Sequence, residues 1–147
     1  MKRLFQLILI LTLFASCSKT IYTSQIGVSI QNIHQIVADT TQLQLEWNKM
    51  ITENNIKGEV SNFNIKTGID ERTEKKYYYL IAKNKEGDLK MATRLIKHNN
   101  IFFLNTSELI YVICYGCTTS YPEIYNGYWG CDSKDLFKCK KIEIVKF

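Results

Sequence analysis

Four cysteines near the carboxyl end are the residues of this chain whose spacing most clearly suggests a chemical role. They are Cys114, Cys117, Cys131 and Cys139, and their spacing is C-x2-C-x13-C-x7-C. Thiols grouped in this way serve in structural disulfides, in zinc sites or in redox couples. The compartment in which the chain matures decides among these three.

A zinc site would use all four cysteines as ligands. A four-thiolate zinc ribbon needs two short C-x2-C knuckles, because each knuckle directs two sulfurs at one tetrahedral metal. Cys114 and Cys117 form one knuckle, whereas seven residues separate Cys131 from Cys139. Half of the signature is missing, so no cofactor is expected and zinc is kept as the alternative.

A redox role would use Cys114 and Cys117 as a C-x-x-C couple. In thioredoxin-like enzymes this motif opens a helix, which lowers the pKa of the first thiol. Here the sequence TTSYP follows the motif and predicts no helix. The chain also lacks a phosphate-binding loop and a nucleophile elbow. No catalytic residue is therefore assigned, and a non-enzymatic role is favoured over a thiol-disulfide enzyme.

The amino-terminal segment indicates export. Lys2 and Arg3 precede an apolar run from Leu4 to Ala15, which is the order of a secretory signal. The run of about a dozen residues is shorter than the roughly 20 that a membrane-spanning helix needs. We therefore predict a cleaved signal peptide over residues 1–16.

The end of this segment, Phe14-Ala15-Ser16-Cys17, resembles the lipobox of bacterial lipoproteins, with Phe14 in place of the usual leucine. The resemblance implies cleavage before Cys17, a diacylglycerol group on its thiol and an acyl chain such as palmitate on its amine. Several acyl chains hold a protein stably on a membrane. The expected location is the bacterial cell envelope, facing the periplasm or the cell surface. The alternatives are an ordinary cleaved signal or an apolar helix of a cytosolic protein.

Export bears directly on the chemistry of the thiols. If Cys17 carries lipid, four cysteines remain in an oxidising space, where an even number normally pairs as structural disulfides. Three pairings are possible, and the sequence does not choose among them. We expect at least one bridge from the Cys114–Cys117 region to Cys131 or Cys139.

Size and charge are those of one small domain. Removal of residues 1–16 leaves 147 − 16 = 131 residues, which we divide into a lipidated cysteine with a tether (17–28) and a globular domain (29–147). The formal charge falls from +5 to +3 when Lys2 and Arg3 are removed. The remaining bases are mostly lysines mixed with acids, so nucleic acid is not an expected partner.

The periodicity of the chain predicts one helix followed by strands. Asp39-Thr40-Thr41 is a helix start signal, and Leu43, Trp47, Met50 and Ile51 follow at helical spacing, which predicts a helix from about Thr41 to Asn54. Ile30, Ile33, Ile36 and Val37 also recur at helical spacing. Alternating residues then predict strands over 59–67, 76–83, 89–97, 101–105 and 110–114. The strand that begins at Leu89 turns Lys90 and Arg94 away from its apolar face, as in a sheet packed on one side.

These elements predict an α+β fold, in which one main helix packs on an antiparallel meander of about four or five strands. The carboxyl-terminal loop that follows is held by disulfides and carries Tyr121, Tyr125, Tyr128 and Trp129 among glycines. Rigid aromatic side chains of this kind anchor ligands, and the alternative is a small core under the disulfides. We expect a lipid-anchored binding domain with a protein or glycan partner. Small lipoproteins of similar size include inhibitors and immunity proteins.

Overall fold

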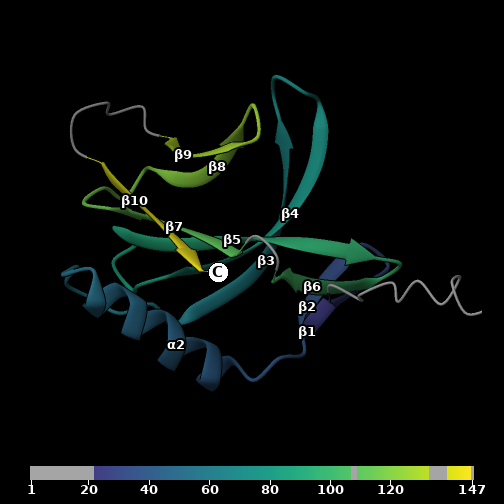
Figure 1. The fold of residues 1–147 in the computed structure, drawn as a ribbon, viewed down its shortest axis with the longest axis horizontal. Helices are drawn as coiled ribbons and strands as arrows, with labels where there is room; N and C mark the ends of the chain where they lie inside the picture. The colour runs from purple at the N-terminus through teal and green to yellow at the C-terminus, as the bar shows by residue number, and fades with distance from the viewer. Residues whose placement is uncertain (1–21, 107–108, 133–138, 147) are drawn as a thin grey trace, which may run out of the picture.

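The computed structural model describes residues 22–106, 109–132 and 139–146 (Figure 1). The predicted signal peptide and Cys17 lie outside these ranges. Within them, no helix is long and apolar enough to cross a bilayer. The elements in chain order are β1 (Tyr22–Ile30), β2 (Ile33–Ile36), α2 (Thr40–Glu53), β3 (Asn62–Asp70), β4 (Lys75–Lys83), β5 (Leu89–His98), β6 (Ile101–Asn105), β7 (Leu109–Tyr115), β8 (Tyr121–Tyr125), β9 (Tyr128–Asp132) and β10 (Lys140–Lys146).

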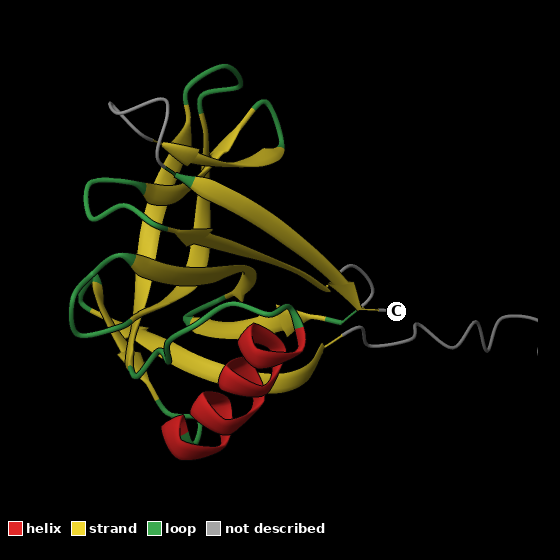
Figure 2. Ribbon diagram, turned by 90° about the vertical axis from the view of Figure 1, so that its left-hand side faces the viewer, coloured by secondary structure: helices red, strands yellow, loops and turns green. Residues whose placement is uncertain are grey.

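Eight strands form one antiparallel sheet with β5 at its centre. One edge of β5 pairs with β4, and β4 pairs with β3. The other edge pairs first with β7, which carries β10, and then with β6, which leads to β1 and β2. The sheet curves until β2 approaches β3, where His34 Nε2 and Thr67 Oγ1 lie 3.1 Å apart. The strands therefore wrap into a nearly closed barrel (Figure 2).

The predicted α+β fold, with one main helix on a sheet of four or five strands, is wrong. The chain is mostly β structure, and its single described helix is a short element beside a larger, curved sheet. The five predicted strands are present as β3 to β7, with ends that differ by up to three residues. The prediction failed because β1, β2, β8 and β9 lie in segments that the sequence suggested were tether, helix or loop.

The helix itself is confirmed. Asp39 caps its amino end, since one carboxylate oxygen accepts hydrogen bonds from the backbone N–H of Thr41 at 2.9 Å and of Gln42 at 3.3 Å. Its buried residues are the ones predicted from the spacing, Leu43, Trp47, Met50 and Ile51. These side chains fix the helix against one face of the sheet.

The segment from Ile30 to Val37 contains the turn and the second strand of the β1–β2 hairpin, although its apolar spacing suggested a helix. Gln31 and Asn32 both have positive φ, 49° and 66°, which is the backbone of a two-residue hairpin turn. Ile30 pairs with Ile33 across that turn, and both side chains are more than half exposed. Ile30 and Ile33 are therefore exposed beside a strand turn, Ile36 packs against the core from β2, and the four residues do not form one face of a helix.

Both faces of the sheet are covered, so the expectation of a sheet packed on one side is also wrong. The helix lies on one face, and the hairpin of β8 and β9 lies on the other (Figures 1 and 2). Lys90, which the alternation of β5 places on the hairpin side, is only 1% exposed. The second layer consists of β8 and β9, in a segment that was predicted to be a loop.

Candidate functional site

The aromatic segment at the carboxyl end is a β-hairpin. Tyr125 pairs with Tyr128 across an Asn126-Gly127 turn, in which both residues have positive φ, 53° and 82°. Asn-Gly between alternating residues is the standard signal for this type of turn, so the hairpin was predictable from this dipeptide. In this hairpin, successive side chains of β8 and β9 point alternately toward the sheet and away from it.

The two faces of the hairpin separate the predicted binding residues. Tyr121, Tyr125 and Tyr128 are 46%, 59% and 75% exposed, and we call these three residues the tyrosine face. Ile124 and Trp129 pair on the opposite face and are buried. The structure therefore leaves three of the four candidates open to a partner and places Trp129 in the core.

Trp129 packs on the sheet through other aromatic rings. Its ring lies edge-on to Tyr77 and Tyr79 of β4, with centroid distances of 6.4 and 6.1 Å. Edge-to-face geometry of this kind is favourable beyond the apolar area that it buries. Burial raises the pKa of Tyr79 to about 12, so this phenol stays neutral at physiological pH. Trp129 thus holds the hairpin down on the sheet.

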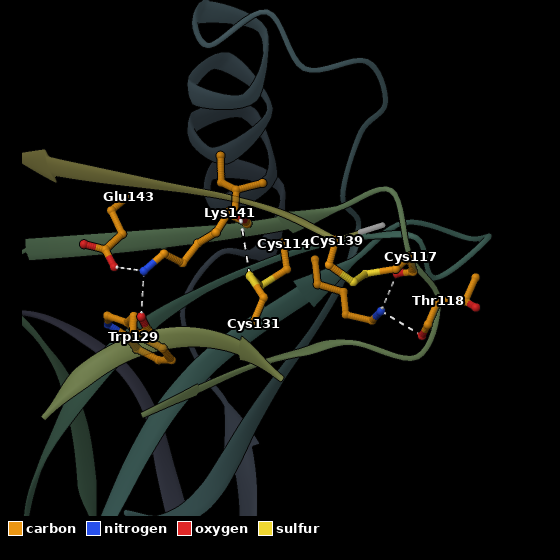
Figure 3. The surroundings of a disulfide bond; sticks show 10 residues. Cys114, Cys117, Thr118, Trp129, Cys131, Cys139, Lys141 and Glu143 are labelled. Atoms are coloured by element: carbon orange, nitrogen blue, oxygen red, sulfur yellow. Dashed lines mark hydrogen bonds and ion pairs between the residues drawn. A yellow bond between two sulfur atoms is a disulfide. The ribbon is translucent and has the colours of Figure 1, made fainter. Parts of the chain in front are cut away.

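Two disulfides connect the hairpin segment to its neighbours. Cys114 at the end of β7 bonds Cys131 in β9, and Cys117 bonds Cys139 just before β10 (Figure 3). The predicted structural disulfides are thus present, in one of the three possible pairings. All four sulfurs are used, so none is left as a thiolate for zinc. Cys114 and Cys117 bond different partners and not each other, which is not the pairing of a C-x-x-C redox couple.

Asp70 clasps the tip of the hairpin. Its two carboxylate oxygens accept hydrogen bonds at 2.8 Å from the backbone N–H groups of Asn126 and Gly127, and one oxygen also accepts from Arg72 and Thr73. Desolvation raises the pKa of Asp70, but these backbone hydrogen bonds outweigh it and leave the pKa below its ordinary value. A charged side chain at the end of β3 therefore fixes the turn next to Tyr125 and Tyr128.

Tyr77 holds the middle of the hairpin. Its ring lies directly over Gly68 on β3, where an added Cβ would overlap the ring. Its hydroxyl oxygen accepts a hydrogen bond from the backbone N–H of Ile124 at 3.0 Å. Gly68 is thus needed for the close approach of Tyr77, and Tyr77 in turn sets the height of β8 above the sheet.

Two lysines hold the base of the hairpin segment. The ammonium of Lys90 donates to the carbonyl oxygens of Cys117 at 3.3 Å and Thr118 at 2.9 Å, and it lies 4.6 Å from the ring centre of Tyr121. Burial lowers the pKa of Lys90. Lys141 of β10 donates to the carbonyl of Trp129 and to Glu143, both at 2.9 Å (Figure 3). These contacts use lysines that the sequence alone presents as surface charges.

A cavity of about 440 Å³ opens between the hairpin and β3. Its lining includes Tyr79 and Tyr125, with Glu71 and Glu123 among the polar residues. Tyr125 thus borders both the cavity and the tyrosine face. The arrangement is a rigid aromatic surface next to a hollow, and within the described ranges no group of three His, Cys, Asp or Glu side chains could hold a metal ion.

No family model, curated protein or solved structure matches this chain. Function is therefore inferred from the geometry of the chain's own residues.

Proposed function

We propose that this chain is an exported, lipid-anchored binding domain that presents the tyrosine face to a protein partner. The observation that carries the proposal is the exposure of Tyr121, Tyr125 and Tyr128 on one side of a hairpin that is fixed at both ends. Tyrosine is one of the residue types enriched in binding hot spots.

The rigidity of the hairpin supports binding over a merely structural role for these side chains. The disulfides, the Asp70 clasp and the Trp129 contacts hold the backbone before any partner arrives. A preordered surface loses less conformational entropy on association and therefore binds more tightly for the same contacts. The buried side chains, the disulfides and the Asp70 hydrogen bonds hold the hairpin without Tyr125 and Tyr128, which are 59% and 75% exposed.

The shape of the site favours a protein over a glycan. Sites for small ligands are concave and enclose most of the ligand, whereas the tyrosine face is open to solvent. The cavity beside Tyr125 would receive one anchoring side chain of the partner. An inhibitor or immunity-type protein, which neutralises a toxin or lytic enzyme at the envelope, is the form of this function that we favour.

The test is affinity capture from envelope extract with the full chain as bait. We compare wild type with Tyr125→Ala/Tyr128→Ala, and use Leu45→Ala as the matched control. Leu45 is an exposed apolar residue on the helix, 63% exposed, on the other side of the sheet. Trp129 is left intact, because its truncation would cost about 3–5 kcal/mol of stability and confuse folding with binding.

One protein retained by wild type and by Leu45→Ala, but lost from the double tyrosine variant, would support the proposal. Equal retention by all three would place the binding site elsewhere. If a polysaccharide is retained in place of a protein, and is lost from the double tyrosine variant, the partner is a glycan and the proposal of a protein partner is wrong.

A further inference from the structure

A second cavity lies where the hairpin meets β4 and β5, whereas the cavity that Tyr125 borders lies between the hairpin and β3. Its volume is about 490 Å³, which is within the range of small-molecule sites. Aromatic residues of β4 and β9 line it, namely Tyr77, Tyr78 and Trp129. The charged residues that line it are Lys76, Arg94 and Lys97, and we call this cavity the basic cleft.

The basic cleft lies where β4 and β5 separate. The last pair of this ladder is Tyr78 with Leu95, preceded by Tyr79 with Arg94. In an antiparallel ladder, each step back along β4 is one step forward along β5. Two further steps beyond the Tyr78–Leu95 pair would therefore set Lys76 directly opposite Lys97. Like charges in directly opposite positions are destabilising. The pairing ends before these two lysines meet.

Within the described part of the chain, the cations of the basic cleft have no carboxylate partner. Neither ion pair found there involves Lys76, Arg94 or Lys97. Lys97 instead has its ammonium 5.1 and 5.6 Å from the ring centres of Tyr78 and Phe102. The pKa of His34 on the neighbouring β2 is lowered by desolvation first and then by the charges of Lys97 and Lys76. Three cations, and no carboxylate of a described residue, thus line the basic cleft.

A smaller cavity of about 240 Å³ adjoins the basic cleft and shares Tyr77, Arg94 and Gly127 with it. Lys75 and the carboxylate of Asp70 also line this smaller cavity. Both oxygens of Asp70 accept hydrogen bonds from backbone amides, and Asp70 forms no ion pair with Arg94 in the described ranges. Arg94 therefore lines both hollows, and neither ion pair of the described ranges involves its guanidinium.

We propose that the basic cleft binds a small organic molecule that carries a multivalent oxyanion, either phosphate or carboxylate. The planar guanidinium of Arg94 suits two parallel hydrogen bonds to such a group. Strand alternation places Lys76 and Lys97 on the other face of the sheet at the same opening, where their charges add to the positive potential. The aromatic wall would pack against the body of the ligand. This site is separate from the tyrosine face and does not depend on the proposed protein partner.

The test is isothermal titration of the full chain, in uncharged detergent and at low ionic strength, with inorganic pyrophosphate and with citrate as probes. Wild type should bind at least one probe saturably with one site per chain. Arg94→Gln should weaken that binding at least about tenfold, since a hydrogen bond to a charged group is lost. Lys85→Gln, in the exposed β4–β5 turn, removes the same charge outside the cleft and is the control.

The stronger probe identifies the oxyanion, and binding of either with the expected loss in Arg94→Gln supports the site. No saturable binding of either probe would overturn the proposal. An equal loss in Lys85→Gln would also overturn it, because the effect would then come from net charge and not from the cleft. Circular dichroism of both variants checks that each remains folded, and Arg94 is exposed, so the substitution disturbs no core.

Discussion

Asp70 is the single residue on which the position of the tyrosine face most directly depends. Its carboxylate receives four backbone N–H groups from two turns, the β3–β4 turn and the tip of the β8–β9 hairpin. A buried acceptor with several donors cannot be replaced by a neutral side chain without leaving some donors unpaired. The sequence shows only an acidic residue in a charged loop, so this role was not predictable without the fold.

We expect Asp70→Asn to lower the free energy of unfolding at neutral pH, measured by urea unfolding. The hydrogen bonds hold the folded-state pKa of Asp70 below its ordinary value of 3.8. The carboxylate therefore stabilises the fold fully above that value, and this contribution is lost as the pH falls through the folded-state pKa. The difference between wild type and variant should consequently shrink in acid.

Glu86→Gln is the matched control for this prediction, because Glu86 is exposed in the β4–β5 turn and its replacement removes the same charge. Its stability should follow wild type at every pH. A deficit in Asp70→Asn that stays constant from neutral pH into acid would show that the charge of Asp70 does not stabilise the hairpin.

At the scale of elements, the β8–β9 hairpin and its disulfides form the unit that carries the candidate site. Each bridge closes a loop of about 20 residues, with sequence separations of 17 and 22. Loop closure of this size is worth about 3 kcal/mol through the entropy of the unfolded chain. These bridges add to the contacts of Trp129, Tyr77 and Asp70 that hold the hairpin on the sheet.

We expect Cys117→Ser/Cys139→Ser to lower the free energy of unfolding by about 3 kcal/mol relative to the oxidised wild type, measured by urea unfolding. Reductant should bring wild type below the double variant, because it opens both bridges while the variant under oxidising conditions keeps Cys114–Cys131. A variant as stable as oxidised wild type would mean that this bridge adds no constraint.

The elements that the sequence predicted share one property, which is an uninterrupted periodic pattern. The helix has its cap at Asp39 and four buried residues at regular spacing, and β4 to β7 alternate or run apolar between clear turns. The β1–β2 hairpin lacks such a pattern, because the apolar residues Ile30 and Ile33 on either side of its turn are exposed. The β8–β9 hairpin was missed because its tyrosines are exposed while Pro122 and Ile124 are inside.

At the scale of the whole molecule, the barrel could not be predicted because its closure depends on contacts between distant elements. β2 approaches β3 through His34 and Thr67, and one edge of β5 pairs with both β6 and β7. Neither feature leaves a local pattern in the sequence. Local periodicity specifies strands but not the order in which they pair. The second layer over Lys90 follows from the same long-range packing, which is why a lysine predicted to face solvent is buried.

The proposed anchor is also a property of the whole molecule, because it determines where the tyrosine face and the basic cleft are presented. The first described strand begins at Tyr22, five residues after Cys17, so an acylated Cys17 would hold the barrel close to a membrane surface.

We expect intact mass measurement of membrane-extracted protein to give a chain that starts at Cys17 and carries diacylglycerol and acyl groups. Four thiols should become alkylatable only after reduction. Cys17→Ser should abolish the lipid increment and release the protein from the membrane fraction, while the two disulfides stay intact. An unlipidated chain in wild type, or free thiols before reduction, would refute the proposed envelope location and with it the choice of an envelope partner.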